Sequence, residues 1–291
     1  MKSVVVTGSS TGIGFGAAKV LVEKGFRVFG SVRKQEDAER LAKVLGANFV
    51  PLVFDVTDTA AVNAAAGTVA AALGGETLFG LVNNAGIAVA GPLLYLKVDE
   101  FRHQLEVNVT GQVIVTQAFA PLLMSSADRP GLPRRSSEGA RPGRIVMISS
   151  VGGRNANPFM APYCASKFAL EGLSESLRRE LLLFGIDVIV VAPGAVATPI
   201  WDKAEEVDVT QYDNTPYKDQ LARIRDYMIT NGPKGLKPEV LGRAIHRALT
   251  AARPRTRYTV TPDPLQNLVL GLLPKRMVDK VIGGRLGLVR K

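Results

Sequence analysis

Residues that bind metals or form disulfides are scarce in this sequence. The 291 residues include one cysteine, Cys164, and two histidines, His103 and His246. A single cysteine cannot form an internal disulfide, and it suits a reducing compartment. Three such residues are too few for a Cys/His zinc site, and they leave few candidates for a Ser-His-Asp triad. We therefore expect no metal and assign no chemistry to either histidine.

Long apolar runs are also missing. No run reaches the roughly 18 residues that a membrane-spanning helix requires. Residues 3–7 lead directly into a glycine-rich turn, which leaves no room for a signal peptide. Apolar residues nevertheless form 46% of the chain and charged residues 21%, which is enough apolar material for a large core. These features predict a soluble, cytoplasmic α/β domain of enzyme size.

Positive charge is concentrated at the C-terminus. The chain has 36 Lys and Arg against 26 Asp and Glu, a net charge of +10. Residues 253–291 hold nine basic and two acidic residues, and so carry +7 of that charge. No nucleic-acid recognition motif accompanies them, and we predict no nucleic-acid partner. The tail is solvated, or meets an anionic membrane or phosphate-bearing ligand, or packs over the substrate crevice of its own chain.

Short β-branched segments alternate with longer helical segments along most of the chain. Such alternation predicts right-handed βαβ crossovers and a parallel sheet covered on both faces. We therefore expect an α/β, doubly wound sheet of seven parallel strands in one domain over residues 1–261. Strands are expected at residues 4–7, 28–32, 49–54, 78–82, 144–148, 187–192 and 258–261, and helices at residues 14–24, 36–45, 59–73, 99–124, 162–184 and 238–251.

Three segments interrupt this alternation. Residues 125–143 are rich in Pro, Gly, Ser and Arg, which predicts a surface loop insertion. Residues 199–235 follow the sixth expected strand and carry scattered aromatic side chains, which suits a segment that covers the substrate. Residues 262–291 form a basic C-terminal extension with short apolar stretches.

A glycine-rich turn separates the first expected strand from the first helix, with the sequence Thr7-Gly8-Ser9-Ser10-Thr11-Gly12-Ile13-Gly14. Gly8 permits a sharp turn, Gly12 lets the backbone approach a pyrophosphate, and Gly14 allows close helix packing. The N–H groups at the helix N-terminus are free to bind the anion. The turn therefore predicts a dinucleotide site whose contacts are Gly8, Ser10, Thr11, Gly12, Ile13 and Gly14.

The end of the second expected strand indicates which dinucleotide binds. An acidic residue there would bond the ribose 2′-hydroxyl and favour NAD, but Val32 fills this position and Arg33 follows. The missing carboxylate removes repulsion of a 2′-phosphate, which Arg33 can bind bidentately. NADP(H) is therefore favoured over NAD(H). In the alternative interpretation, Arg33 and Lys34 only face solvent.

Tyr163 and Lys167 lie four residues apart near the start of an expected helix, so they share one helix face. A phenol with a pKa of about 10 is a poor base at neutral pH, and a neighbouring ammonium group and a nicotinamide would lower that pKa. Thirteen residues before Tyr163, Ser150 follows the fifth expected strand at the sheet edge where ligand crevices lie. Ser149 is its rival by position.

These motifs resemble those of the classical short-chain dehydrogenase/reductase family, and more narrowly its hydroxysteroid and retinol dehydrogenase subgroup. The resemblance covers residues 3–200 by motif and the whole chain by layout. Besides the glycine turn and the Ser/Tyr/Lys set, three further motifs occur in the family's order. They are an Asn-Asn-Ala-Gly segment after the fourth strand (residues 83–86), a helix-borne asparagine (Asn108) and a Pro-Gly loop after the sixth strand (residues 193–198).

The resemblance implies a Rossmann-like fold and an NADP(H)-dependent oxidoreductase that interconverts a ketone or aldehyde and an alcohol by hydride transfer. It implies that Ser150 binds the substrate carbonyl, that Tyr163 supplies the proton, and that Lys167 lowers the pKa of Tyr163 and holds the ribose. Asn108 would position a water that links Lys167 to solvent. As further cofactor contacts it implies Asp55 at the adenine, together with Val56, Asn84, Ala85, Gly86, Tyr163, Lys167, Pro193, Gly194, Val196 and Thr198.

The subgroup implies a bulky lipophilic substrate, either steroid-like or retinoid-like. Mostly apolar residues are expected to line the crevice, namely Ile87, Val89, Leu93, Leu94, Phe159, Met160, Ile200 and Trp201. The family resemblance implies a homodimer or homotetramer, and the basic C-terminus suits peripheral contact with a membrane in which such substrates dissolve. Two alternatives stay open: a catalytically silent NADP(H)-binding regulatory protein, and a reductase of small or acyl carbonyl substrates.

Overall fold

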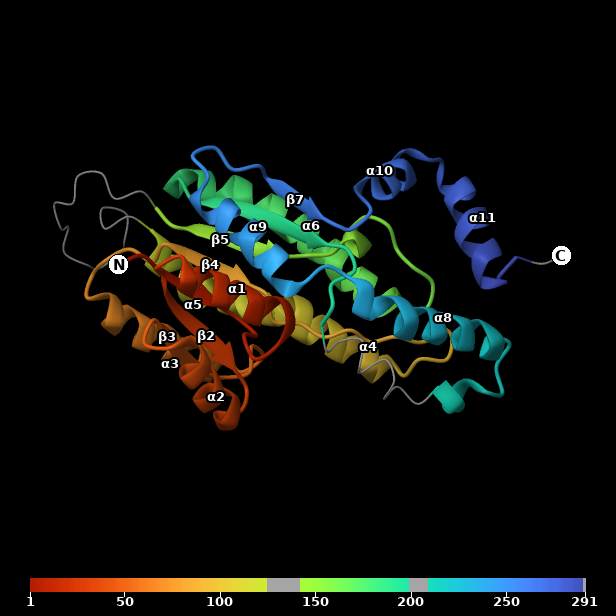
Figure 1. Cartoon of the computed structure of the whole chain (residues 1–291), viewed down its shortest axis with the longest axis horizontal. Coiled ribbons are helices and arrows are strands. Elements are labelled where there is room, and N and C mark those ends of the chain that lie inside the picture. Colours follow the sequence, from red (N-terminus) through yellow and green to blue (C-terminus); the bar gives the residue numbers. More distant parts are fainter. Residues whose placement is uncertain (125–141, 199–208, 290–291) are drawn as a thin grey trace.

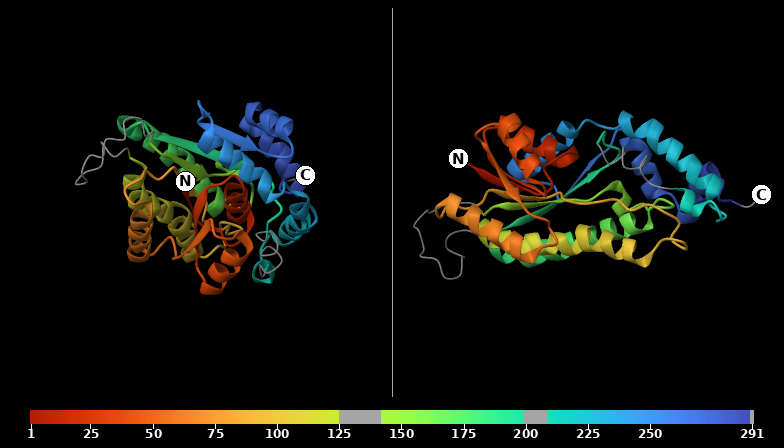
Figure 2. Two further views of the ribbon diagram at one scale, coloured as in Figure 1. Left: turned by 60° about the vertical axis from the view of Figure 1, so that its left-hand side comes forward. Right: turned by 90° about the horizontal axis from the view of Figure 1, so that it is seen from below.

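The computed structural model describes residues 1–124, 142–198 and 209–289. A central sheet of seven parallel strands runs through these residues, with helices on both faces (Figure 1, Figure 2). The strand order is β3-β2-β1-β4-β5-β6-β7, so the order reverses beside β1. Ligand crevices of such sheets lie where the order reverses, at the carboxyl ends of the strands. The expected doubly wound fold is confirmed.

Each expected strand is present, with boundaries that differ by at most two residues. The largest difference is at the fourth strand, because the N–H of Leu78 bonds the carbonyl of Leu122 at 2.8 Å instead of joining the sheet. A strand that is buried on both faces has a continuous apolar sequence, and such runs predicted the strands. The strands are β1 (Ser3–Val6), β2 (Arg27–Val32), β3 (Phe49–Val53), β4 (Gly80–Asn83), β5 (Arg144–Ile148), β6 (Asp187–Pro193) and β7 (Arg257–Val260).

Two apolar layers hold helices against the two faces of the sheet. One layer joins the sheet to α1, α2 and α9, and the other joins it to α3, α5 and α6. Helices α1 and α9 approach closely, because a Cβ on Gly16 would lie 2.6 Å from Pro238. The helix bounds are α1 (Gly12–Glu23), α2 (Gln35–Leu45), α3 (Thr59–Leu73), α4 (Val98–Leu105), α5 (Gly111–Leu123), α6 (Ala161–Glu180) and α9 (Pro238–Thr250).

The expected continuous helix at residues 99–124 is wrong in one respect. Helices α4 and α5 are separated by a turn of π-helix at Glu106–Thr110, where the chain makes one wider turn. Such turns place a side chain in a direction that a regular helix would not allow, and they are frequent at functional sites. The side chain at the centre of this turn is the buried Asn108.

The remaining helices gather at the end of the molecule where the strands terminate (Figure 1). A 3-10 turn at Val209–Tyr212 and helix α8 (Lys218–Asn231) are the described part of the segment expected to cover the substrate. Helices α10 (Pro264–Leu272) and α11 (Lys275–Leu286) form the C-terminal extension. Most of the expected 125–143 insertion lies outside the described residues. Among the helices that are described, none combines the length and apolar character needed to span a membrane.

Candidate active site

A cleft of about 350 Å³ opens beside the carboxyl ends of β1 to β5. Its walls combine the glycine-rich turn, the ends of β2 and β3, the segment after β4 and the start of α6. Four predicted cofactor contacts, Gly14, Pro193, Gly194 and Val196, do not line it. The predicted contacts that do line it are Gly8, Ser10, Thr11, Gly12, Ile13, Arg33, Asp55, Val56, Asn84, Ala85, Gly86, Tyr163, Lys167 and Thr198.

The glycine-rich turn is closed by hydrogen bonds from Asn84. The side-chain amide of Asn84 donates to the carbonyls of Thr7 at 2.8 Å and Gly8 at 3.1 Å. Gly8 and Gly12 have φ of 66° and 58°, the left-handed region that glycine adopts readily. A Cβ on Gly14 would lie 2.1 Å from the Gly8 carbonyl oxygen, so Gly14 is required by the turn itself.

The N-terminus of α1 provides donors that suit a diphosphate. Thr11 precedes the helix with no side-chain capping bond, and the first turn holds no acidic residue. The first N–H groups of a helix have no partner within it, and the helix dipole favours an anion there. Ser10 and Thr11 add hydroxyl groups to this wall of the cleft. The donor set therefore fits the diphosphate of a dinucleotide.

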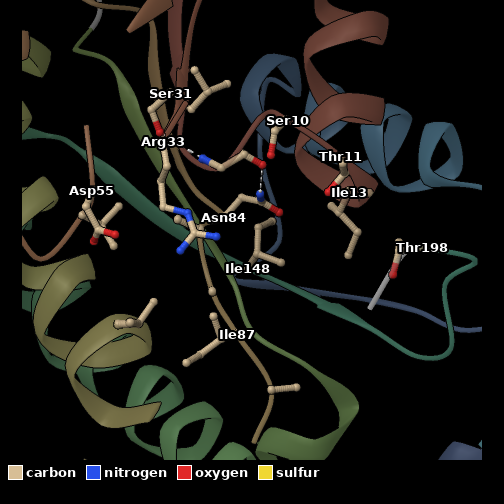
Figure 3. A pocket seen from close by; sticks show the side chains of 18 of the residues that line it. Ser10, Thr11, Ile13, Ser31, Arg33, Asp55, Asn84, Ile87, Ile148 and Thr198 are labelled. Atoms are coloured by element: carbon tan, nitrogen blue, oxygen red, sulfur yellow. Dashed lines mark hydrogen bonds between the residues drawn. The ribbon is translucent and has the colours of Figure 1, made fainter. Parts of the chain in front are cut away.

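The ends of β2 and β3 bring opposite charges to the mouth of the cleft. Figure 3 shows the exposed Arg33 reaching from β2 into the cleft, between Asp55 and Asn84 in that view. Burial would raise the pKa of the Asp55 carboxyl, but two hydrogen bonds from Thr57 and the charge of Arg33 lower it below its ordinary value. Asp55 is therefore an ionised acceptor at neutral pH.

A second basic side chain near this mouth is already engaged. Arg40 pairs with Asp37 at 2.6 Å and donates to the carbonyl of Ser10 at 2.9 Å. Asp37 lines the cleft, and its charge is offset by this pair. Arg33 and Lys34 are the basic residues whose side chains line the cleft mouth.

Ser150 and Tyr163 meet although they belong to different elements. Ser150 follows β5, and its Oγ accepts a hydrogen bond from the N–H of Gly152 at 3.0 Å. Its side chain lies beside Tyr163, near the start of α6, since a Cβ on Gly152 would be 3.3 Å from Ser150 Oγ and 3.6 Å from Tyr163 Cε1. The rival Ser149 lines the cleft, but its buried Oγ has no hydrogen-bond partner among the described residues. The geometry thus pairs Ser150, rather than Ser149, with the phenol.

The Lys167 side chain points to the carboxyl end of β5. Its Nζ donates to the carbonyl of Ile148 at 2.9 Å and lies 5.7 Å from the centroid of the Tyr163 ring. Burial lowers the pKa of Lys167 to about 8. Burial also raises the pKa of Tyr163 above its ordinary value, while the hydrogen bond with Ser150 acts in the opposite direction. The expectation that Lys167 and a bound nicotinamide together lower the pKa of this phenol stays a prediction.

Asn108 fastens the segment after β4 to α6. Its Oδ1 accepts from the N–H of Ile87 at 2.8 Å, and its Nδ2 donates to the carbonyl of Ile87 at 3.0 Å and to Ser166 Oγ at 3.1 Å. The π-helical turn directs the side chain there. The predicted role of Asn108 in positioning a water stays a prediction.

Two buried glutamines that we did not single out share this task. Gln104 bonds the backbone of Ile87 and Val89, at 3.0 and 2.6 Å, and Gln112 donates to the carbonyl of Ala85. Polar residues at positions 104, 108, 112 and 116 recur every four residues along this helical stretch, among mostly apolar neighbours. That spacing places them on one buried face, and it was the available signal.

An aromatic cluster joins the residue two positions before α6, Phe159, to the residue just before α8, Tyr217. The Phe159 and Tyr217 rings lie 5.4 Å apart, and Phe159 has a left-handed φ of 64°, which is unusual for an aromatic residue. Of the expected crevice residues, Ile87 lines the cleft, whereas Leu93 and Leu94 face solvent. Ile200 and Trp201 lie outside the described residues.

The parallel sheet, the anion-binding turn and the Ser-Tyr-Lys cluster define a dinucleotide-dependent oxidoreductase. The family model for short chain dehydrogenases matches residues 2–208. The chain belongs to the short-chain dehydrogenase/reductase family, and its retinol dehydrogenase relatives agree with the predicted subgroup.

Three known proteins show the extent of this similarity. An NADPH-dependent 3-dehydrocapnine reductase from Ornithobacterium rhinotracheale is 36% identical over 282 residues, which cover 97% of this chain and 96% of that protein. Human retinol dehydrogenase 5 is 35% identical, covering 96% of this chain and 87% of its own. A solved actinorhodin polyketide ketoreductase with NADPH has a TM-score of 0.73 at 26% identity, covering 94% of this chain and 98% of its own.

Proposed function

We propose that this chain is an NADP(H)-dependent oxidoreductase that interconverts a bulky lipophilic ketone or aldehyde and the corresponding alcohol. The observation that carries the proposal is the cluster of Ser150, Tyr163 and Lys167: Ser150 Oγ lies beside the Tyr163 ring, and the buried Lys167 Nζ is 5.7 Å from the centroid of that ring. Tyr163 and Lys167 line the cleft, whereas Ser150 lies just behind its lining, and the other end of the cleft suits a dinucleotide diphosphate. A protein that only senses a dinucleotide has no need of such a cluster.

The preference for NADP(H) rests on charge at the end of β2. Arg33 and Lys34 line the cleft where the ribose 2′-phosphate would lie, and Val32 provides no carboxylate to repel it. Arg33 is not engaged in a hydrogen bond with another described residue, so its donors are available. The NADPH-dependent relative from Ornithobacterium rhinotracheale supports the same preference.

The chain's own groups divide the work of proton transfer and charge stabilisation. A bound reduced nicotinamide supplies the hydride. The Ser150 hydroxyl donates to the substrate carbonyl oxygen as negative charge develops there. Tyr163 holds the proton that this oxygen receives, because burial keeps the phenol protonated at neutral pH. Lys167, fixed by the carbonyl of Ile148, holds the nicotinamide ribose and places positive charge beside the phenol.

The lipophilic substrate class is supported by an aromatic cluster just before α6 and by an apolar residue at the cleft. Phe159 and Tyr217 pack edge to face, and Ile87 borders the cleft. An apolar wall selects bulk and shape but distinguishes similar ligands only weakly. Retinol dehydrogenase 5 among the relatives supports a bulky lipophilic substrate, and the polyketide ketoreductase among the solved structures keeps an acyl carbonyl substrate as the alternative.

A substrate panel tests the proposal. The purified protein is mixed with NADPH or NADH and with hydrophobic ketones, retinoid aldehydes, small ketones and acyl thioesters, and absorbance at 340 nm is followed. The proposal predicts oxidation of NADPH with the bulky lipophilic carbonyls, at a higher kcat/KM than with NADH. Turnover of small or acyl carbonyls alone would contradict the substrate class. NADPH binding without turnover of any member would favour a regulatory protein.

A further inference from the structure

Helix α10 carries an apolar stripe that no part of the described chain covers. Leu265, Leu268, Val269 and Leu272 follow the spacing of one helix face, and the three leucines are 72%, 58% and 77% exposed. In a globular protein such a stripe normally faces the core, and its burial drives helix formation. The described residues leave this stripe uncovered, so its burial requires a surface beyond them.

One face of helix α11 packs against the rest of the chain. Val278 is buried, and Leu288, just after the helix, packs against the apolar cluster of Phe159, Tyr212 and Leu221. Gln220 of α8 donates to the carbonyl of Gly287 at 3.2 Å. At the other end Lys275 donates to Asn155 at 3.3 Å, on the loop between Ser150 and Tyr163. One face of α11 is therefore attached to the elements around the active site.

The opposite face of α11 combines apolar and basic residues. Met277 and Val281 are exposed and one turn apart, and Arg276 and Lys280 form the adjacent row. Arg276, Lys280 and the exposed Arg285 have no ion pair with another described residue. Asp279 is the one acidic residue of this helix. The exposed surface thus carries net positive charge around an apolar strip.

We propose that α10 and the exposed face of α11 dock on an anionic lipid bilayer. The leucines of α10 would enter the boundary between headgroups and acyl chains, while Arg276 and Lys280 contact the phosphates. Protein interfaces are depleted in lysine and in charge at their cores, so the basic rows favour a lipid surface over a protein partner. Since the C-terminal segment bonds both α8 and the Asn155 loop, the docked surface lies next to α8 and to the loop between Ser150 and Tyr163.

Vesicle binding of the full-length protein tests this directly, without cofactor or substrate, so its outcome is independent of the proposed function. Vesicles of pure phosphatidylcholine are compared with vesicles in which one lipid in three is phosphatidylglycerol, in a flotation assay. We expect binding to the anionic vesicles that weakens with added salt. The double substitution Leu268→Ser with Leu272→Ser should reduce affinity at least about a hundredfold, because each buried leucine contributes about a factor of ten or more.

Control variants remove the same kinds of side chain from other surfaces, so that loss of docking can be told from a general effect of lower hydrophobicity or charge. Leu182→Ser with Leu183→Ser removes two leucines of similar exposure, 71% and 81%, on a different surface, and should bind vesicles like the parent. Arg276→Gln with Lys280→Gln should weaken binding about thirtyfold, whereas Lys24→Gln with Lys43→Gln removes the same charge and should not.

Three results would overturn the proposal. In the first, the parent does not bind the anionic vesicles. In the second, the parent and the α10 variant bind these vesicles equally. In the third, each control pair of substitutions weakens binding as much as the pair that it controls. Sedimentation velocity identifies the competing occupant, a second copy of the chain. A parent oligomer that dissociates in the α10 variant, without vesicle binding, would show that the stripe is a subunit interface.

Discussion

The preference for NADP(H) can be tested by removing one side chain, Arg33. Hydrogen bonds to charged groups contribute about 1.5–3 kcal/mol, which corresponds to about 10–150-fold in affinity. Arg33 is exposed, so solvent and salt weaken its contribution and the lower end applies. We expect Arg33→Gln to weaken NADPH binding about tenfold to thirtyfold. NADH binding should change less than about threefold, because NADH has no 2′-phosphate.

The assay is a titration of the protein with each reduced nucleotide, followed by nucleotide fluorescence, and it requires no knowledge of the substrate. Lys43→Gln is the control, because Lys43 is an exposed basic residue of α2 that does not line the cleft. Arg33→Gln should leave the melting temperature unchanged. Equal weakening of NADPH and NADH by Arg33→Gln would refute the assignment of the 2′-phosphate to Arg33.

The substitution Val32→Asp, which the sequence suggests for reversing the preference, is a poorer test. Val32 is buried in the apolar layer between the sheet and α1, α2 and α9. A carboxylate introduced there would lose its hydration, at a cost in folding free energy that is independent of the cofactor. Arg33 lies outside that layer, so its replacement isolates the electrostatic effect.

Three further predictions concern the turn, the buried lysine and an ion pair away from the cleft. Gly14→Ala should abolish nucleotide binding and destabilise the fold by about 1–3 kcal/mol, measured by thermal denaturation, because the new Cβ would lie 2.1 Å from the Gly8 carbonyl oxygen. Unaltered binding would contradict the tight turn. The pKa of Lys167 is lowered to about 8 in the folded chain, from 10.5. Between about pH 8 and pH 10.5 the unfolded chain therefore binds more protons than the folded chain, and the contribution of this lysine to stability rises with pH. Denaturant titrations of Lys167→Met at pH 7.5 and pH 9.5 should show that rise reduced by about 2 kcal/mol at most, and an unchanged rise would show that the lysine is not desolvated. Arg257→Gln should lower the free energy of unfolding by about 2 kcal/mol without altering nucleotide binding. Arg257 lies 3.1 Å from the largely buried Glu171, and the substitution leaves that carboxylate with a weaker partner. A free energy of unfolding equal to that of the parent would contradict this prediction.

The strands and the glycine turn could be predicted because their signals are local. Strands buried on both faces appear as short apolar runs, and a left-handed turn at Gly8 and Gly12 requires glycine in the sequence itself. The interruption at Glu106–Thr110 could not be read in this way. It depends on bonds between Asn108 and the backbone of Ile87, which is distant in sequence and becomes a neighbour only in the folded sheet.

The electrostatics of the site depended on burial, which the sequence does not provide. The spacing of Tyr163 and Lys167 predicted one helix face, and the two side chains are neighbours as expected. In the polypeptide alone, burial raises the pKa of Tyr163, and Lys167 Nζ is turned to the carbonyl of Ile148, so the lowering of that pKa by lysine and nicotinamide together stays a prediction. The two faces of α11 could likewise not be told apart in the sequence, because they are set by packing against α8, which is distant along the chain.

The measurement that tests the central claim most directly is the kcat of Tyr163→Phe with the best carbonyl substrate from the panel and NADPH. Loss of a positioned proton donor reduces rates by about 10²–10⁴. The account predicts a kcat at least about 10² lower, with NADPH affinity in the fluorescence titration within about threefold of the parent. A variant that retains most of the parent kcat would show that the phenol beside Ser150 and Lys167 is not the proton donor.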